Sequence, residues 1–563
     1  MPAKQPRPAA YRRLSRRILE AVTEATSGSA SAGRPPDALG AAGPVPVGHA
    51  GAPHRTEILA ALSLAIDLGL GQPMEHMLRA TLLGLRIADR AGVDPAARGR
   101  IYYANLLAWI GCHADSFELA ALFGDDIGFR ADYYMVDARG LPMLSLMLRH
   151  AGSGLPPLKR TARRSLFAAT AATAVRALIR SHCTSAGHLA YRVGLDAGMP
   201  AILSHTFERW DGKGLPEGRS GVEIPLEMRI AQLADVAEVF LRTRGLDAAV
   251  ATVRNRRGTQ FDPELADLFC KYAGELTESL LDIDPWPAAL AQAPDNRALA
   301  GEELDTVLAA VGDFADLKSP YTAGHSRAVA TLAAETAAEY GLKAAEIEVL
   351  RRAGWVHDLG RMGVSNGVWD KKSPLSSMDL ERIQMYPFFG ERILGRVPGM
   401  GRVAEVAGAH HERLDGSGYP RGRGGADLDP SQRILAAADA YQTSLEPRPH
   451  RPEMSPQAAG QRLRAEVGAG RLEERAVDAV LVAAGQKERR RRVWPKGLTE
   501  REAEVLGLLC HGMNNREIAS ALVISPKTAR NHVEHIYLKI GAGNRVSATL
   551  FALDQGLWDR AAG

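Results

Sequence analysis

The chain of 563 residues contains little cysteine, few aromatic residues and no long apolar run. Its four cysteines are isolated, whereas zinc sites and disulfide frameworks need closely spaced or paired cysteines, so we exclude both. No apolar stretch reaches the roughly 18–20 residues that cross a bilayer, and no apolar core follows the basic N-terminus as it does in a secretory signal. These absences favour a cytoplasmic protein that makes no use of a membrane.

Excess charge is small overall, but it is unevenly distributed. The net charge is +4, yet residues 1–54 hold seven basic and three acidic residues, and residues 486–563 hold thirteen and eight. A basic C-terminal segment is a candidate contact for nucleic acid, because neutralising phosphates supplies most of the sequence-independent affinity. A solubilising tail would carry the same charge, so motifs must decide between the two.

Strand signals are few, and apolar residues mostly recur at helical spacing, which predicts an all-α protein. The N-terminal segment is rich in Ala, Pro, Gly and Ser and cannot bury enough apolar surface to fold. The predicted order is a disordered basic arm at 1–54, a helical domain at 55–286, a connection at 287–300, a second helical domain at 301–485, a basic linker at 486–496 and a compact helical domain at 497–563.

The two larger helical domains are similar to each other, as tandem copies of one unit would be. His76 matches His325 at an offset of 249 residues, whereas Asp235 and the glycine-rich loop before it match Asp439 and its loop at an offset of 204. Two constant offsets favour duplication over chance similarity. Their difference means that the first copy carries about 45 extra residues between positions 109 and 182.

The second copy concentrates metal-binding types of side chain within apolar helices. They are His325, His357, Asp358, His410, His411 and Asp439. Imidazole and carboxylate ligands together suit a divalent transition metal such as Fe or Mn, whereas Mg or Ca sites consist mostly of oxygen ligands. A lone helical histidine is usually structural, but so many unpaired buried polar groups would be costly. The set therefore favours a site for one or two ions.

Five stretches of this copy match the pattern of a known family. They are Tyr321–Ser326, His357–Gly360, His410–Pro420, Arg433–Asp439 and Arg448–Arg451. With them, residues 302–485 resemble an HD-GYP domain, the subgroup of HD-superfamily phosphohydrolases that typically cleaves cyclic di-GMP. The resemblance implies an all-helical bundle that holds metals between its helices, and the chain would then contain two tandem HD-type bundles.

The resemblance also implies a role for each residue. The first metal would be bound by His325, His357, Asp358 and Asp439. The second would be bound by His410, His411 and the bridging Asp358. A metal pair lowers the pKa of a bridging water and clamps both the attacking and the leaving oxygen of a phosphodiester. Asp358 and Arg361 would take part in catalysis, and Arg448 and Arg451 would hold the nucleotide.

Three departures from the family pattern leave turnover open. Tyr386 stands where the family usually has the histidine of a His-Pro pair, which removes one ligand from the second metal. Arg361 replaces the usual lysine, and Tyr321 stands where some members place a glutamate for a third metal. The module is therefore either a phosphodiesterase for cyclic di-GMP or a related phosphodiester, or a silent nucleotide sensor. A pure scaffold is a third reading.

The first copy lacks most of these ligands. It has Ala108-Trp109 in place of the His-Asp pair and Thr206-Phe207 in place of the two adjacent histidines. Because Ala, Trp and Phe side chains do not bind metals, we expect this copy to be inactive and to serve as a scaffold or sensor pocket. His182, which aligns with Tyr386, would either complete the second site or be a structural remnant, and we favour the remnant.

The C-terminal segment contains two sets of helix-start signals. Thr499 and Glu502 form a capping-type pair at the start of an apolar-periodic stretch. Ser525 followed by Pro526 predicts the start of a later helix. Short helices with a tight turn between them, the second carrying polar donors near its N-terminus, are typical of a helix-turn-helix.

Three sequence motifs of this segment match the pattern of a known DNA-binding family. They are Leu498-Thr499-x-Arg501-Glu502, Asn515-Arg516-Glu517-Ile518-Ala519, and Ser525-x-x-Thr528 followed by His532-Val533-x-x-Ile536. With them, residues 497–560 resemble the LuxR-type family of four-helix DNA-binding domains. The resemblance implies contacts to double-stranded DNA through Lys527, Thr528, Arg530, Asn531, His532 and Lys539, with the last helix pairing two copies as a homodimer. We therefore expect a transcriptional regulator coupled to a metal-binding HD-GYP-like module.

Overall fold

The computed structural model describes residues 51–152, 157–486, 494–555 and 557. Most of the predicted basic arm and the Arg489–Arg492 run of the predicted linker lie outside the described residues. Within the described ranges every regular element is a helix, so the all-α prediction is confirmed. The chain divides between Gln486 and Lys487 into a larger and a smaller compact unit.

The described residues of the first half of the larger unit form twelve α-helices and two short 3-10 helices. Its elements are α2 (Arg55–Gly69), α3 (His76–Arg90), α4 (Pro95–Leu107), η1 (Ile110–His113), α5 (Ser116–Phe123), α6 (Asp126–Tyr133), α7 (Gly140–His150), α8 (Pro157–Arg192), α9 (Met199–Leu203), η2 (Gly221–Glu223), α10 (Leu226–Arg244), α11 (Leu246–Asn255), α12 (Pro263–Thr277) and α13 (Pro285–Leu290).

The second half of the larger unit continues the helical pattern without a strand among its described residues. Its elements are α14 (Gly301–Asp316), η3 (Pro320–Thr322), α15 (His325–Tyr340), α16 (Ala344–Val356), η4 (Leu359–Gly363), α17 (Asn366–Trp369), α18 (Ser377–Leu394), α19 (Gly401–Gly408), η5 (Gly425–Asp427), α20 (Pro430–Leu445), α21 (Pro456–Gly468) and α22 (Glu474–Ala483).

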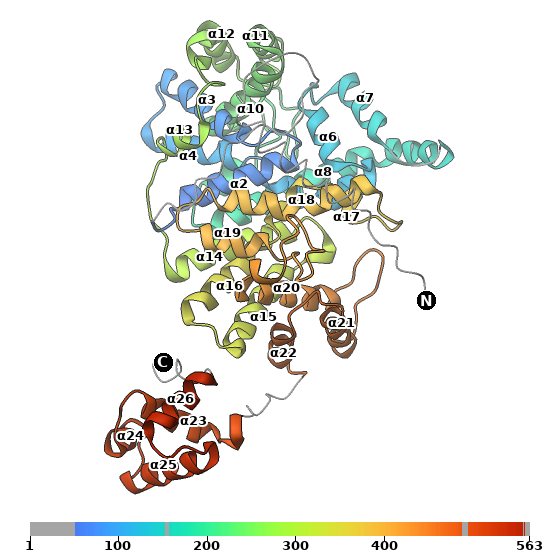
Figure 1. The fold of residues 1–563 in the computed structure, drawn as a ribbon. Coiled ribbons are helices and arrows are strands. Elements are labelled where there is room, and N and C mark those ends of the chain that lie inside the picture. The colour runs from blue at the N-terminus through green and yellow to red at the C-terminus, as the bar shows by residue number, and fades with distance from the viewer. Residues whose placement is uncertain (1–50, 153–156, 487–493, 556, 558–563) are drawn as a thin grey trace, which may run out of the picture. The chain divides into compact units, whose positions relative to one another are not determined.

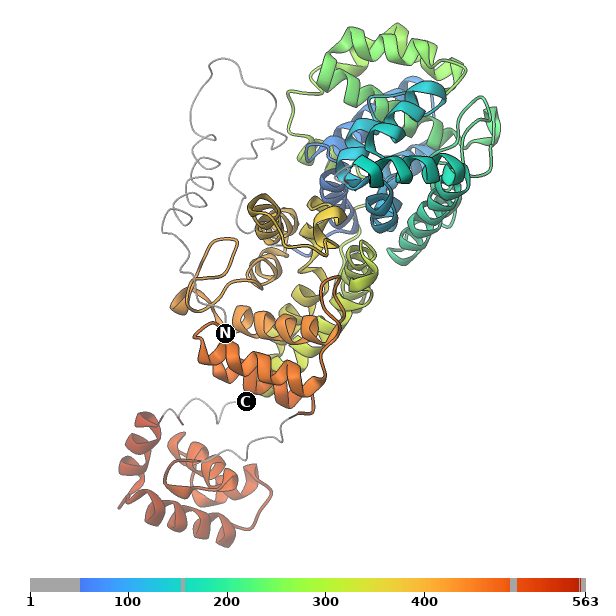
Figure 2. The same ribbon diagram turned by 90° about the vertical axis from the view of Figure 1, so that its right-hand side faces the viewer.

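The two halves of the larger unit share one hydrophobic core. A single cluster of buried apolar residues runs from Ile58 in α2 to Leu481 in α22. In Figure 1, α2 of the first half lies beside α18 of the second, and these two helices are in contact. Figure 2 shows the remaining first-half helices gathered at one end of this unit and the second-half helices at the other. The halves are thus packed against each other rather than strung along a connection.

Both halves begin their central helix in the same way. His76 is the first residue of α3 and follows Glu75, whose φ is +81°, and His325 is the first residue of α15 and follows Gly324, whose φ is +79°. A left-handed residue before each histidine turns the chain sharply into the helix. The imidazole in each half is therefore fixed at a helix start and directed into the bundle, where it is fully buried.

The glycine-rich loops of the two halves also have matching conformations. A Cβ added to Gly214 would come within 2.5 Å of Glu208 backbone, and one added to Gly418 would come equally close to Glu412 backbone. Each glutamate accepts a hydrogen bond from a backbone N–H nine residues later. Only glycine fits such a close approach, which explains why the loop pattern occurs in both copies.

The extra residues of the first half form α5, α6, α7 and the start of α8. Asp126, at the beginning of α6, is completely buried and reaches the second half of the unit. Its carboxylate accepts hydrogen bonds from the Ser365 hydroxyl at 2.7 Å and the Asn366 backbone N–H at 2.8 Å. The Arg130 guanidinium donates to the same carboxylate at 2.9 Å. This segment therefore connects the two halves through a buried polar cluster.

The smaller unit contains the four expected helices around its own core. They are α23 (Glu500–Cys510), α24 (Asn515–Ala521), α25 (Pro526–Ile540) and α26 (Arg545–Asp554), preceded by η6 (Pro495–Gly497). The predicted caps are confirmed, because the Thr499 hydroxyl accepts the Glu502 N–H and the Ser525 hydroxyl accepts the Thr528 N–H. Val505 and Ile536 are fully buried in this core.

Length and composition give one weak candidate for a membrane span. Among the described residues, no single helix is both long and apolar enough to cross a bilayer. One pair, Pro95–His113 with Ser116–Phe123, meets the requirement only when its two parts are taken together across a bend of 58°.

Candidate metal centre and DNA-binding helix

Four segments of the second half bring the predicted metal ligands together. His325 begins α15, His357 and Asp358 lie between α16 and η4, His410 and His411 follow α19, and Asp439 lies within α20. One ligand atom from each of His325, His357 and Asp358 lies within 4.8 Å of the others. Asp439 Oδ1 lies 3.4 Å from His325 Nε2 and 3.9 Å from His357 Nε2. Side chains distant in sequence thus converge on one small volume.

Two atoms at the centre of this cluster lack a partner within the described part of the chain. His357 Nε2 and Asp358 Oδ1 are buried and accept or donate no hydrogen bond there. A buried polar atom left unpaired costs about 1–3 kcal/mol. A cation between these atoms would satisfy both, so the donor set fits the metal that the sequence predicts.

The imidazoles of His357 and His410 are oriented by backbone carbonyls. His357 Nδ1 lies 2.8 Å from the carbonyl oxygen of Gly354, and His410 Nδ1 lies 2.6 Å from that of Ala407. Because a carbonyl only accepts, each Nδ1 carries the proton and donates it. Each Nε2 is therefore unprotonated and carries a lone pair, which is the tautomer that a metal ligand needs.

Arg361 holds Asp358 in its ionised form. Its guanidinium donates to Asp358 Oδ2 at 2.8 Å and lies 4.1 Å from the centre of the Trp369 ring. Burial opposes ionisation of Asp358, but the charge of Arg361 and the neighbouring imidazoles hold the pKa of its carboxyl well below the usual range. Since Oδ2 is used by Arg361, Oδ1 is the oxygen that remains for a metal.

Glu446 is part of the site and was missed in the sequence. Its carboxylate lies 2.9 Å from His325 Nδ1, on the side of the ring away from the cluster. Burial lowers the pKa of His325, but hydrogen bonds to Asp439 and Glu446 outweigh it and raise the pKa to about 10. Glu446 follows Asp439 by seven residues, about two helical turns, and is the first residue after the end of α20. That spacing is the signal that would have found it.

Tyr386 fills the position next to the second predicted metal site. Its side chain is buried, and its hydroxyl lies 2.7 Å from both His410 Nε2 and His411 Nε2. Since His410 Nδ1 carries the proton of that ring, the Tyr386 hydroxyl donates to His410 Nε2. Burial lowers the pKa of His410 to about 4. The side chain that replaces the expected ligand thus occupies the ligand atoms of both histidines.

The two predicted nucleotide-binding arginines lie at the end of α20 and are held by protein oxygens. Arg448 donates to the Glu446 carboxylate at 2.9 Å and also to the carbonyl of Tyr321. Arg451 donates to the carbonyls of Ser444 and Glu446 at 3.2 and 3.1 Å. Arg448 is therefore linked to the metal cluster through Glu446, whereas Arg451 caps the helix end.

At the equivalent place in the first half, protein donors pair the aspartate. Asp235 accepts hydrogen bonds from His76 Nε2 at 2.9 Å, from the Trp109 indole N–H at 3.0 Å and from the Tyr134 hydroxyl at 3.4 Å. His182 Nε2 lies 2.9 Å from the Ala108 carbonyl and stays within the first half. The Trp109 side chain stands where Asp358 stands in the second half, so no cation is needed to pair Asp235.

The predicted DNA contacts lie on α25 in the smaller unit. Lys527, Thr528, Arg530 and Asn531 are exposed at its N-terminal half, and His532 is partly exposed. Ala529 and Val533, on the opposite face, are buried. Lys539 lies near the other end and donates to the Glu502 carboxylate at 2.6 Å and the Gly497 carbonyl at 3.0 Å.

Comparison with known families assigns both units to classes. The family profile described as "HD domain" matches residues 164–265 and 310–475, one segment in each half. The profile described as "Bacterial regulatory proteins, luxR family" matches residues 496–552. The chain therefore carries an HD domain, which implies dependence on a metal, and a C-terminal LuxR-family helix-turn-helix domain.

Similar proteins are phosphodiesterases. "3'3'-cGAMP-specific phosphodiesterase 3" of Vibrio cholerae is 29% identical over 411 residues, which are 71% of this chain and 88% of that protein. "Cyclic di-GMP phosphodiesterase" of Thermotoga maritima is 30% identical over 151 residues, which are 26% of this chain and 40% of that protein. The crystal structure of a cyclic GMP-AMP-specific phosphodiesterase of V. cholerae has a TM-score of 0.54 at 25% identity and covers 78% of this chain and 99% of that chain. The HD module is thus related to cyclic-dinucleotide phosphodiesterases.

Proposed function

We propose that the chain is a cytoplasmic transcriptional regulator whose second HD half is an HD-GYP-type phosphodiesterase for a 3',3'-linked cyclic dinucleotide. The observation that carries the proposal is the buried cluster in which His357 Nε2 and Asp358 Oδ1, 3.6 Å apart, have no hydrogen-bond partner within the described residues. The relatives named as phosphodiesterases for cyclic di-GMP and 3'3'-cGAMP support the substrate class. Both of these dinucleotides are candidates.

The residues of the second half would have distinct roles in metal binding and hydrolysis. His325, His357, Asp358 and Asp439 would hold one divalent metal, iron, manganese or similar, and His410 and His411 would hold a second if the Tyr386 hydroxyl moves aside. A bound metal of this kind polarises a phosphoryl oxygen and activates water. Arg361 keeps Asp358 ionised, and Glu446 fixes the His325 ring. Arg448 lies close enough to the cluster to reach a substrate phosphate once it leaves Glu446.

Metal content and hydrolysis test this proposal together. The protein, loaded anaerobically with iron or manganese, is assayed with cyclic di-GMP and with 3'3'-cGAMP, and the linear products are measured. We expect turnover and about one metal per chain in the wild type, with both lost in His357→Ala. His188→Ala, which removes an exposed histidine of the first half, is the control and retains both. Equal activity of wild type and His357→Ala rejects the proposal.

A silent sensor is the second candidate, and one observation favours it. The Tyr386 hydroxyl engages the Nε2 atoms of both His410 and His411, which leaves the second metal short of ligands. Under this reading the module binds the dinucleotide and changes DNA binding without cleaving it. Calorimetric binding of cyclic di-GMP to metal-loaded protein, with no linear product after prolonged incubation, would select the sensor over the enzyme.

For the smaller unit we propose that α25 enters the major groove of DNA and that two chains bind as a homodimer. The exposed polar side chains at the N-terminal half of α25 support groove contact. Val546 and Leu550 are 68% and 57% exposed on α26 and offer an apolar face for the second copy. Lys527→Ala should weaken binding at all sequences and lower the salt dependence of affinity, because it removes one phosphate contact.

A control variant and a defined negative result test the proposed DNA contact. Lys271→Ala removes an exposed lysine from the larger unit and should leave anisotropy-based affinity for duplex DNA unchanged. Selection from a random duplex library should enrich two-fold symmetric sites, as a dimer requires. Equal affinity of Lys527→Ala and wild type would remove α25 from the interface.

We further propose that the two units are coupled, so that dinucleotide or metal in the HD module changes DNA affinity. The fusion of both units in one chain supports this. Operator affinity is measured with and without metal, and with and without cyclic di-GMP. Identical affinities under all four conditions would reject the coupling and leave the two activities independent.

A further inference from the structure

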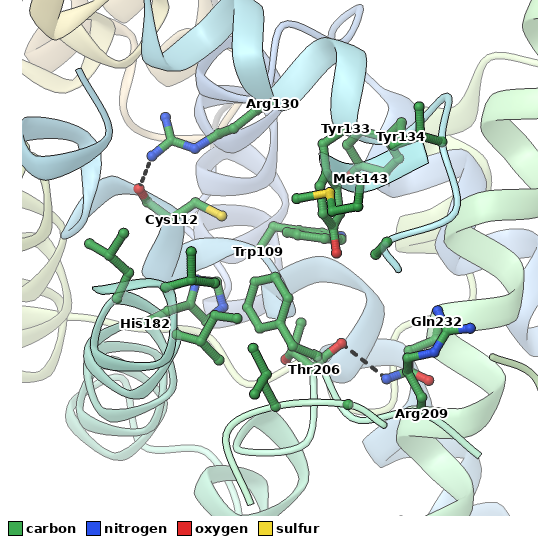
Figure 3. Close-up of a pocket in the computed structure, with 18 of the residues that line it drawn as sticks. Trp109, Cys112, Arg130, Tyr133, Tyr134, Met143, His182, Thr206, Arg209 and Gln232 are labelled. Carbon is green, nitrogen blue, oxygen red and sulfur yellow. Dashed lines mark hydrogen bonds between the residues drawn. The ribbon is translucent and has the colours of Figure 1, made fainter. Parts of the chain in front are cut away.

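A cavity lies in the first half at the place that corresponds to the metal centre of the second. Its volume is about 240 Å³. Trp109, the counterpart of Asp358, lies at its centre, with Tyr133, Tyr134 and Met143 on one side and His182 and Thr206 on the other (Figure 3). The loss of the metal ligands has therefore not simply filled this half with side chains, and a space large enough for a small molecule remains.

The inserted helices supply an apolar wall of the cavity. Tyr133 comes from α6, and Met143 and Met147 come from α7, elements that belong to the extra residues of the first half. Leu178 and Ile179 of α8 add branched aliphatic groups to the lining. A wall of this composition fits a hydrocarbon chain or ring rather than a strongly polar molecule.

Two buried arginines line the cavity from other elements. Arg209 is 5% exposed; its Nη1 donates to Asp137 at 3.0 Å and its Nε lies 3.5 Å from Asp211 Oδ1, whereas its Nη2 has no hydrogen-bond partner within the described chain. Arg256 is 8% exposed and donates to the Gln260 side chain at 3.0 Å. Burial lowers the pKa of the Arg256 guanidinium, and the charge of the Asp137 carboxylate opposes this. Buried guanidinium groups that keep free N–H donors are suited to an anion.

The acidic groups of the lining do not compete for these arginines. The Glu208 carboxylate accepts three backbone N–H groups of the following loop, and Asp235 is paired with His76, Trp109 and Tyr134. Burial raises the pKa of Asp115 to about 7. An anion near Arg209 and Arg256 would thus meet opposing charge chiefly from Asp137 and Asp211, which Arg209 and Arg139 already pair.

One polar group of each amide in the lining is already engaged. The Gln232 side-chain N–H₂ donates to the carbonyls of His205, Thr206 and Glu208, and the Gln260 oxygen accepts from Arg256. A nucleobase would need free groups to pair with its polar edge. An apolar body with a single anionic group needs only the apolar wall and the two arginines.

We propose that this cavity is a second ligand site that binds an amphipathic organic acid, an aliphatic or single-ring body that carries one carboxylate. The carboxylate would bind Arg209 and Arg256, and the apolar body would lie against α6, α7 and α8. The inference does not depend on catalysis in the second half, because it rests on the first-half cavity alone.

Calorimetric titration of the full-length protein tests the site with decanoate as the probe and 1-decanol as its uncharged counterpart. We expect decanoate to bind at one site per chain and 1-decanol to bind at least about tenfold more weakly, since a charged hydrogen bond contributes 1.5–3 kcal/mol. Arg256→Gln should weaken decanoate binding to a similar degree. Met143→Trp, which fills the cavity from its rim, should abolish it.

Leu144→Trp is the matched control, because Leu144 follows Met143 on α7 but is 47% exposed; it should bind decanoate as the wild type does. Circular dichroism shows whether each variant folds, and Arg256→Gln gives a separate answer if Met143→Trp does not. Equal binding of decanoate and 1-decanol, or decanoate binding that survives both variants, overturns the proposal. Cyclic di-GMP that binds to His357→Ala protein but not to His357→Ala with Met143→Trp would instead assign the cavity to a nucleotide.

Discussion

Both halves of the HD module bury a carboxylate at the centre of a helical bundle, but they stabilise it in different ways. In the first half, the carboxylate of Asp235 is paired with an imidazole, an indole N–H and a phenol. In the second half, His357 Nε2 and Asp358 Oδ1 remain buried without a partner in the described chain. An indole in place of a carboxylate converts a site that needs a cation into one that needs none, while the surrounding fold persists.

In both halves a carboxylate bonds to Nδ1 of the histidine that begins the central helix, but it comes from a different sequence position in each half. His76 Nδ1 bonds to Glu238, whereas His325 Nδ1 bonds to Glu446. At the offset of 204, Glu238 aligns with Gln442 rather than with Glu446. The supporting carboxylate has moved by four residues, from within the helix to the residue that follows the end of α20. What persists is a carboxylate behind the ring of this histidine.

The largest effect is expected from an isosteric change made at the matching aspartates of the two halves. Asp439→Asn should abolish metal binding and lower hydrolysis by about a thousandfold, since metal catalysis contributes several kcal/mol. Asp235→Asn should leave metal content unchanged and lower the free energy of unfolding by about 1–3 kcal/mol, because buried donors lose their acceptor. Metal analysis, product assays and urea unfolding measure these effects. Loss of metal in Asp235→Asn would remove the distinction between the halves.

The next effect concerns the stability that His76 contributes, which depends on pH. Burial opposes its charge, but Glu238 and Asp235 outweigh burial and raise the pKa of His76 from 6.5 to about 9. A raised folded-state pKa stabilises the protein fully below the unfolded pKa, and this contribution is lost as pH rises through the folded pKa. The stability difference between wild type and His76→Gln should therefore shrink by up to roughly 3 kcal/mol from about pH 6 to about pH 10.

Urea unfolding across this pH range measures the difference. His188→Gln, at an exposed position of α8, is the histidine control and should show a much smaller change with pH. A difference between wild type and His76→Gln that is constant with pH would mean that His76 is neutral in the folded protein.

Glu446→Gln should have a smaller effect, on metal affinity. Carboxylates behind metal-binding histidines typically change affinity by about 10–100-fold when mutated, and Glu446 is the group that holds the His325 ring. Competition with a fluorescent chelator measures the affinity. Glu453→Gln, an exposed glutamate of the same half, should bind metal normally, and an unchanged affinity in Glu446→Gln would exclude this supporting role.

Tyr386→His is expected to produce the smallest change, a gain. It supplies the ligand that the family pattern places there, and it removes the hydroxyl that occupies His410 and His411. Metal content should rise from about one toward two per chain and turnover should rise by about tenfold, equivalent to 1.4 kcal/mol. Tyr386→Phe removes the hydroxyl without adding a ligand and should gain little. Equal metal content in all three proteins would show that this position does not limit the second metal.

The sequence predicted features that depend on local pattern. Helical periodicity gave the all-α class, and the caps at Thr499 and Ser525 follow from neighbouring residues. The ligand set of the second half came from resemblance to a family, and it stays a prediction, although the structure brings those side chains together. Local pattern could not place the Tyr386 hydroxyl between two imidazoles, because that contact depends on how α18 packs.

Contacts between distant segments could not be predicted from the sequence either, because they also depend on how the helices pack. Glu446 could have been recognised from its spacing to Asp439, but nothing in the sequence pairs Arg448 with it. The role of the extra residues was also unreadable, since Asp126 meets Ser365 across 239 positions. Long-range polar pairs carry no periodicity and become visible only when the helices are assembled.

The buried cluster around Asp126 limits how this protein can be divided or recombined. Lys318 is 2% exposed, and its ammonium group lies 3.7 Å from the Asp126 carboxylate, which belongs to the other half. A chain shortened to begin at residue 301 would keep the lysine but lose its counter-ion, and stranding a buried charge in this way typically costs about 3–5 kcal/mol. Although its sequence has the pattern of a tandem repeat, the HD region should therefore be expressed and engineered with both halves together.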